Sequence, residues 1–136
     1  MLYLACPYSH SDAAVRNRRY RIACRTAANI IKAGIAVFSP LSHSVPIAQI
    51  GGIAATDTEF WLEQDLPFLR LCGEMLILGL PGWEDSIGVR TEMVEAMSLE
   101  KPVSIISESD IDLLPVIPAS AAYYLKSSIF NINDDK

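Results

Sequence analysis

Two acidic residues fall on helix faces that are otherwise apolar. With 100° between successive residues, Glu92 lies within about 40° of the apolar centre around Val89 and Met93. It also falls in the second turn of a helix predicted to begin at Ser86, near the positive end of the helix dipole. A carboxyl group in this position is a candidate for acid–base or nucleophilic chemistry. The alternative is a flank residue whose stem packs while its carboxylate reaches water.

Asp65 shows a similar pattern. Trp61 and Phe68 flank it on one side, and leucines flank it on the other, so it is drawn toward an apolar helix face. Pro67 offers a competing interpretation, because proline has no N–H to donate within a helix. Asp65 would then be the N-cap of a shorter helix that begins at Leu66. The pattern alone favours the N-cap.

Short apolar runs predict the strands that must position these two acids. Each run is continuously apolar, which is typical of parallel strands covered on both faces. The predicted strands are residues 2–6, 35–38, 75–80 and 103–106, and helical patterns lie between them at residues 12–33, 57–71 and 86–99. This alternation predicts an α/β fold with a parallel sheet of four or five strands.

The length of 136 residues favours a single domain, which we expect over residues 1–130, followed by a frayed tail at 131–136. Residues 113–117 are a candidate fifth strand, and residues 119–130 are a candidate last helix. Residues 40–56 are predicted to form a connection that is long for this fold class, and this connection could serve as a lid over a site.

Composition narrows the classes of partner. Apolar residues make up 51% of the chain and charged residues 20%, which excludes intrinsic disorder away from the ends. No apolar run is long enough to cross a membrane and no signal peptide is visible, so we expect a soluble, cytoplasmic protein without a membrane partner. Three scattered cysteines without a CxxC pair suggest neither disulfides nor a zinc site.

Charge is unevenly distributed along the chain. Residues 1–50 carry six Arg or Lys against a single acid, Asp12, whereas residues 51–136 carry five against fifteen, for a net charge of −5. An acidic chain with one short basic segment is a poor candidate for binding a nucleic acid polymer, which needs many phosphate contacts. It could instead hold one small anion.

Ligands in open parallel sheets bind beyond the carboxyl ends of the strands. Three predicted loops lie there, at residues 7–12, 39–43 and 81–86, and the candidate binding residues within them are Pro7, Tyr8, Ser9, His43, Trp83 and Ser86. Trp83 could stack on a base or simply anchor its loop. His43 is isolated in the sequence, and a histidine in a turn or at the surface is the more common case.

The start of the third predicted helix has the features of an anion pocket. Ser86 offers a capping side chain, the first turn offers free N–H groups, and Gly88 permits close approach of a ligand. Arg16 is the best-placed cation to bind a phosphate, although its stem could instead lie over the core. Many ordinary helices begin in the same way.

Three segments together resemble a known family. Residues 3–9 read Tyr-Leu-Ala-Cys-Pro-Tyr-Ser, residues 63–66 read Glu-Gln-Asp-Leu, and residues 86–92 read Ser-Ile-Gly-Val-Arg-Thr-Glu. Their order resembles the nucleoside 2-deoxyribosyltransferase superfamily, including the 2′-deoxynucleoside 5′-monophosphate N-glycosidases. The start of the chain is similar to a compact bacterial and phage branch, and the similarity spans about residues 1–106.

This resemblance implies a flavodoxin-like three-layer fold, and a homodimer or higher homo-oligomer. It implies cleavage or exchange of the N-glycosidic bond of a nucleoside or nucleotide without metal or cofactor. By matching position, Glu92 would be the nucleophile at C1′, Asp65 would assist proton transfer or bind the sugar, and Tyr3 would position the nucleophile. Ser86 and Gly88 would hold a 5′-phosphate if the substrate has one.

Such chemistry needs two carboxyl groups in different environments. We expect Glu92 to stay ionised near its helix start, and Asp65 to have a raised pKa against Trp61 and Phe68. The alternative function is a nucleotide-binding or sensing module that uses the same pocket without catalysis, because fold alone does not fix function.

Overall fold

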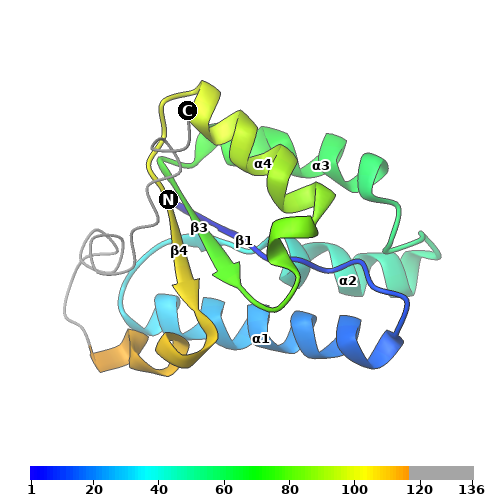
Figure 1. Cartoon of the computed structure of the whole chain (residues 1–136), viewed down its shortest axis with the longest axis horizontal. Helices are drawn as coiled ribbons and strands as arrows, with labels where there is room; N and C mark the ends of the chain where they lie inside the picture. The colour runs from blue at the N-terminus through cyan, green and yellow to red at the C-terminus, as the bar shows by residue number, and fades with distance from the viewer. Residues whose placement is uncertain (117–136) are drawn as a thin grey trace.

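A parallel sheet covered by helices on both faces forms the protein (Figure 1). The computed structural model describes residues 1–116. Its strands are β1 Leu2–Ala5, β2 Val37–Phe38, β3 Glu74–Gly79 and β4 Val103–Ser107. Its helices are α1 Ala13–Lys32, α2 Pro40–Gly51, α3 Thr58–Leu71 and α4 Ile87–Ser98, and two 3₁₀ segments are η1 Trp83–Asp85 and η2 Glu108–Val116.

The strand order is β2-β1-β3-β4, and every pairing is parallel. Leu2 pairs with Val37 on one side and with Glu74 on the other, so β1 lies inside the sheet. The chain moves outward in opposite directions from β1 and β3, which makes the ends of these strands the topological switch point. This architecture confirms the predicted α/β, flavodoxin-like three-layer fold.

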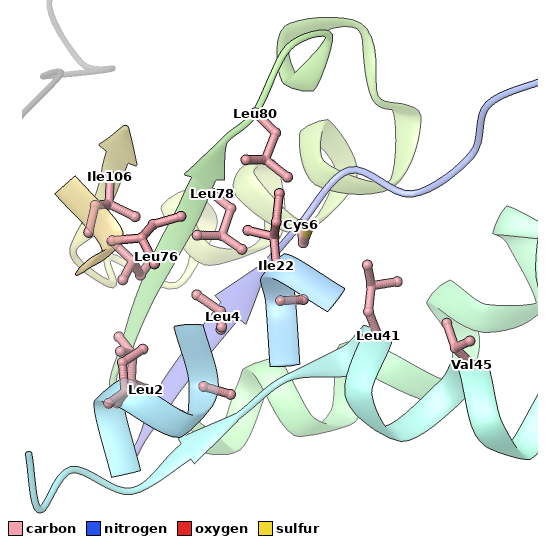
Figure 2. Packing of buried hydrophobic residues seen from close by; sticks show 14 residues of the cluster. Leu2, Leu4, Cys6, Ile22, Leu41, Val45, Leu76, Leu78, Leu80 and Ile106 are labelled. Atoms are coloured by element: carbon pink, nitrogen blue, oxygen red, sulfur yellow. The ribbon is translucent and has the colours of Figure 1, made fainter. Parts of the chain in front are cut away.

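Alternate residues of the strands enter two different cores. Leu2 and Leu4 of β1 face α1 and α2, as do Leu76 and Leu78 of β3. They form one apolar cluster with Ile22 of α1 (Figure 2). The residues between them face α3 and α4, in a cluster that contains Tyr3, Ala5, Met75, Ile77, Leu69, Val89 and Ala96. Because both faces are covered, both must be apolar, which explains the continuous apolar runs in the sequence.

Side-chain caps mark where α1 and α3 begin. Asp12 Oδ1 accepts a hydrogen bond from the Ala14 N–H at 2.8 Å at the start of α1. Asp57 Oδ1 accepts from the Phe60 N–H at 3.3 Å at the start of α3. These caps satisfy N–H groups that have no partner within their helix. The predicted helices at residues 12–33, 57–71 and 86–99 are confirmed as α1, α3 and α4.

The long connection predicted at residues 40–56 is wrong over most of its length, because Pro40–Gly51 is the helix α2. Pro40 occupies the start of this helix, where its missing N–H costs nothing. Gly52 ends it in the left-handed region at φ 69°. Pro46 lies inside the helix and hides the signal, because an internal proline is a strong sequence argument against a helix.

The N-cap interpretation of Asp65 is also wrong. The helix α3 begins at Thr58, seven residues before Asp65, and continues through Pro67. Pro67 and Glu63, whose carbonyl loses its usual helical donor, are both exposed, so water can satisfy that carbonyl. Asp65 is therefore a buried residue in the middle of a helix.

The predicted fifth strand at residues 113–117 is wrong where it can be compared, because residues 113–116 belong to η2. Residue 117, the candidate helix at 119–130 and the tail at 131–136 lie outside the described residues. Over residues 1–116, no helix combines the length and the hydropathy that crossing a membrane requires.

Candidate functional site

A cavity of about 180 Å³ opens beyond the carboxyl ends of β1 and β3, at the topological switch point. Cys6, Tyr8 and Ser9 line it from the segment after β1, and Asp85, Ser86, Ile87, Gly88 and Glu92 line it from the segment after β3 and from α4. The remaining walls come from α2, α3 and the connection between them, through Pro40, Leu41, Ser44, Ala55, Thr58, Trp61, Leu62 and Asp65.

Asp65 and Glu92 are the two buried acids of this cavity. They come from different helices, α3 and α4, and are only 7% and 6% exposed. Within the described part of the chain, neither Asp65 Oδ1 nor Glu92 Oε2 has a hydrogen-bond partner. Buried carboxylate oxygens are nearly always paired, so two unpaired ones in a single cavity indicate a site built to meet something other than the protein.

Burial raises the pKa of both acids. It raises the pKa of Asp65 to about 6. It raises the pKa of Glu92 to about 8, with a further upward contribution from the charge of Asp65 and an opposing one from the hydroxyl of Tyr3. Near neutral pH the pair therefore carries about one negative charge, with the proton mainly on Glu92.

The expectation for Asp65 is confirmed, whereas the expectation that Glu92 stays ionised is wrong. Glu92 lies six residues beyond the Ser86 cap, and the helix dipole acts mainly within the first turn. Loss of hydration therefore outweighs the dipole at Glu92.

Tyr3 lies behind the two acids. It is fully buried on the α3–α4 face of β1, and its ring centroid is 5.9 Å from that of Phe38. Burial raises the pKa of the Tyr3 hydroxyl, and the charges of Glu92 and Asp65 raise it further, so the hydroxyl stays protonated. This hydroxyl makes no hydrogen bond of standard geometry within residues 1–116, although it acts on the pKa of Glu92 as a nearby donor. Tyr3 thus lies where it can orient Glu92.

The start of α4 forms one wall of the cavity. Ser86 Oγ accepts a hydrogen bond from the Val89 N–H at 3.3 Å and caps the helix. A Cβ atom at Gly88 would lie 3.9 Å from both Ser86 Oγ and Glu92 Oε1. Glycine therefore leaves open the space between the cap and the carboxyl group, as the sequence predicts for a position of close approach.

Four of the predicted binding residues do not line the cavity, while Tyr8, Ser9, Ser86 and Gly88 do. Pro7 is buried behind it. Arg16, the expected phosphate partner, is half-buried and donates to the backbone carbonyls of His10 and Ser11.

His43 and Trp83, the other two candidate binding residues that do not line the cavity, are packing residues. The His43 ring lies 5.6 Å from the ring of Phe38 and 5.8 Å from that of Phe68. Trp83 packs against the apolar cluster between the sheet and α3–α4, so it anchors its loop. Sequence position placed both residues near the correct edge of the sheet but could not show which way their side chains turn.

Arg19 is a residue that the sequence analysis missed. It is only 8% exposed, and it donates to the carbonyls of Tyr8 at 3.4 Å, Ser9 at 3.1 Å and Pro81 at 2.8 Å. It therefore ties the loop after β1 to the loop after β3, the two loops between which the cavity opens. The available signal is its spacing, because Arg19 is in phase with Ile22 on the buried face of α1.

Residues 1–108 match the family model described as "Domain of unknown function (DUF1937)". The chain belongs to this family. The matched span includes all four strands and every residue that lines the cavity, so the two acids are part of the DUF1937 domain. A search of the curated proteins found no match to the chain. Among the residues whose positions are described, this DUF1937 domain has no cluster of three His, Cys, Asp or Glu side chains able to hold a metal ion.

Proposed function

We propose that this DUF1937 domain cleaves or exchanges the N-glycosidic bond of a nucleoside or its 5′-monophosphate, like the nucleoside 2-deoxyribosyltransferase superfamily that its sequence resembles. One observation carries the proposal. Glu92 and Asp65, which the resemblance assigns to catalysis, come from separate helices to line one cavity, and each keeps a buried oxygen without a partner in the described residues.

The proposed reaction uses the two acids in opposite states of protonation. Glu92, as a carboxylate, attacks C1′ and forms a glycosyl ester, while Asp65, as an acid, protonates the departing base. Water or a second base then attacks C1′, gives its proton to the Asp65 carboxylate and releases Glu92 as a carboxylate. Water gives hydrolysis and a base gives transfer, so one site supports both outcomes.

This mechanism requires a proton to move before the bond breaks. At neutral pH the free protein holds the shared proton mainly on Glu92, because the pKa of Glu92 is about 8 and that of Asp65 is about 6. Substrate binding must transfer this proton to Asp65 so that Glu92 becomes the carboxylate. Positive charge that develops at C1′ as the bond breaks then stabilises the Glu92 carboxylate that this transfer leaves.

Tyr3 supports Glu92 in this scheme. Its hydroxyl favours the ionised form of Glu92, as the downward effect on the pKa of Glu92 shows. A neutral, fully buried hydroxyl can donate to the carboxylate without competing for its proton. We therefore assign Tyr3 as a positioning residue.

Base release is the experiment that tests this function. The purified protein is incubated with a panel of nucleosides and 5′-monophosphates, with and without an acceptor base, and the products are separated by chromatography. We expect a free base or an exchanged nucleoside from wild type, and a loss of at least about a hundredfold in Glu92→Gln. Glu95→Gln is the matched control, because Glu95 lies on the same helix and pairs with Arg70 at 2.8 Å outside the cavity. Equal turnover by wild type and Glu92→Gln would reject the mechanism.

A second candidate function is binding of the same ligand class without chemistry. The specific observation in its favour is the raised pKa of Glu92, which leaves little nucleophilic carboxylate in the free protein at neutral pH. Binding of a nucleoside with no base released over a long incubation would favour this function over catalysis.

The resemblance also predicts a homodimer or a higher homo-oligomer. Ile50 and Ile87, which are 91% and 71% exposed, lie on the two helices α2 and α4 that contribute walls to the cavity, and apolar side chains this exposed are available for a contact between copies. Light scattering coupled to size-exclusion chromatography tests this assembly.

A further inference from the structure

The charged groups that line the cavity are all acids, and Glu92 is the one that holds a proton at neutral pH. Three acids line it, namely Asp65, Asp85 and Glu92. Of the described residues that form its walls, none is an arginine, a lysine or a histidine. A 5′-phosphate carries between one and two negative charges at neutral pH, and placing it here would bring it beside carboxylates with no cation to compensate.

Arg16 and Arg19, the arginines that hold the loops beside the cavity, donate to backbone carbonyls. Arg19 gives its guanidinium to three carbonyls, of Tyr8, Ser9 and Pro81, and is buried by these contacts. Arg16 donates to the carbonyls of His10 and Ser11, on the exposed side of the loop after β1. Recruiting either guanidinium to a phosphate would break contacts that hold the loops in place.

The start of α4 compensates for these acids only in part. A helix N-terminus attracts anions through its free N–H groups and its dipole. Here Ser86 Oγ already accepts from the Val89 N–H, and Asp85 lies immediately before the cap with its carboxylate on the cavity wall. The negative charge of Asp85 at this point opposes the binding of a second anion.

The depth of the acids in the cavity is consistent with exclusion of a phosphate. The innermost acids, Glu92 and Asp65, are more than nine-tenths buried, and each has an unpartnered oxygen among the described residues. The ionised Asp65 can accept hydroxyl or amino hydrogens of a sugar or a base and repels an anionic oxygen, whereas Glu92, which holds the proton at neutral pH, is neutral toward that oxygen. Asp85, in contrast, is exposed at the mouth, so it meets an incoming ligand first.

We infer that the cavity selects an uncharged nucleoside and that Asp85 is the specificity-determining residue that rejects the phosphate of a 5′-monophosphate. This inference rests on the proposed function for the nature of the substrate. The sequence leaves two substrate classes open, nucleosides and their 5′-monophosphates, and this inference selects the nucleosides.

The test compares matched pairs of ligands. Dissociation constants of the 2′-deoxynucleosides and of their 5′-monophosphates are measured by equilibrium dialysis in a Glu92→Gln background, in which the proposed reaction is blocked. We expect each monophosphate to bind at least about tenfold more weakly than its nucleoside. Adding Asp85→Asn should reduce this ratio at least about threefold, and raising the salt to about 0.5 M should also reduce it, because Asp85 is exposed.

Glu84→Gln is the matched control. Glu84 is the exposed neighbour of Asp85 in the same 3₁₀ turn, and its substitution removes the same unit of charge without touching the cavity wall. The ratio should stay within about twofold of its value before the change. A role for Asp85 that depended only on net charge would change the ratio equally in both variants, and this result would overturn the assignment.

The remaining outcomes separate this inference from the proposed function. Monophosphates that bind as tightly as nucleosides, or more tightly, would overturn the inference even if wild type releases base from them. Preferential binding of nucleosides with no base released by wild type would support the inference and reject the catalytic function. Absence of binding by both ligand classes would reject both.

Discussion

Removing the Glu92 carboxyl group should stabilise the protein relative to wild type, by an amount that grows as the pH rises. The pKa of Glu92 is about 8 in the folded chain against an ordinary 4.5, so the folded state binds a proton more tightly than the unfolded state does. Stability therefore falls as pH rises between these two values. One pKa unit corresponds to about 1.4 kcal/mol, so the cost of burying Glu92 is about 1 kcal/mol at pH 5 and about 3 kcal/mol at pH 7.

Glu92→Gln removes this titration and keeps the shape of the side chain. Urea denaturation of wild type and Glu92→Gln at pH 5, 6 and 7 gives the difference in their free energies of unfolding. This difference should move in favour of the variant by about 2 kcal/mol between pH 5 and pH 7. The constant part of the difference includes the cost of burying the amide of Gln, so the dependence on pH is the diagnostic quantity.

The control for this experiment is Glu95→Gln on the same helix. Glu95 pairs with Arg70 at the surface, so its loss should cost at most about 1 kcal/mol. A difference between wild type and Glu92→Gln that stays constant from pH 5 to pH 7 would refute the reasoning, because it would mean that Glu92 keeps its ordinary pKa.

Three further predictions follow from individual contacts. Gly88→Ala should lower base release at least about tenfold, because its methyl group would occupy cavity space that a substrate needs, in van der Waals contact with Glu92 Oε1 at 3.9 Å; thermal unfolding should show unchanged or slightly higher stability, since alanine favours a helix. Arg19→Met should destabilise the fold by about 2 kcal/mol in urea denaturation, because three backbone carbonyls lose a shared donor; an unchanged midpoint would show that these contacts contribute nothing. Native protein treated with a maleimide should be modified first at the partly exposed Cys24, with buried Cys6 and Cys72 reacting only on unfolding; mass spectrometry of peptides would reveal the opposite order.

The sequence was a good guide to the layers of the fold and a poorer guide to its irregular parts. Continuous apolar runs located all four strands, because strands covered on both faces need apolar residues on both faces. The helix α2 was missed because Pro40 and Pro46 look like loop residues. Pro40 is tolerated because it lies at the start of the helix, whereas no local pattern encodes how the helix accommodates the internal Pro46.

The depth of the two acids could be predicted in part. Helical phase placed Glu92 toward the core, and its burial confirms this. The ionised state expected for Glu92 was wrong, because the degree of burial depends on what α3 and the sheet bring around it. The role of Arg19 also escaped prediction, because its partners are backbone carbonyls on loops 10 and 62 residues away in the chain. Sequence periodicity shows the face of a helix and not the contacts that this face makes.

The most direct test of the account is the pH dependence of kcat/KM for base release from a nucleoside. One ionised and one protonated carboxyl group are required, so the rate should rise as Asp65 loses its proton near pH 6 and fall as Glu92 loses its proton near pH 8. We predict a bell-shaped profile with its maximum near pH 7, and loss of activity in both Glu92→Gln and Asp65→Asn. A flat profile from pH 5 to pH 9, or turnover that survives either substitution, would contradict the claim that these two acids break the bond.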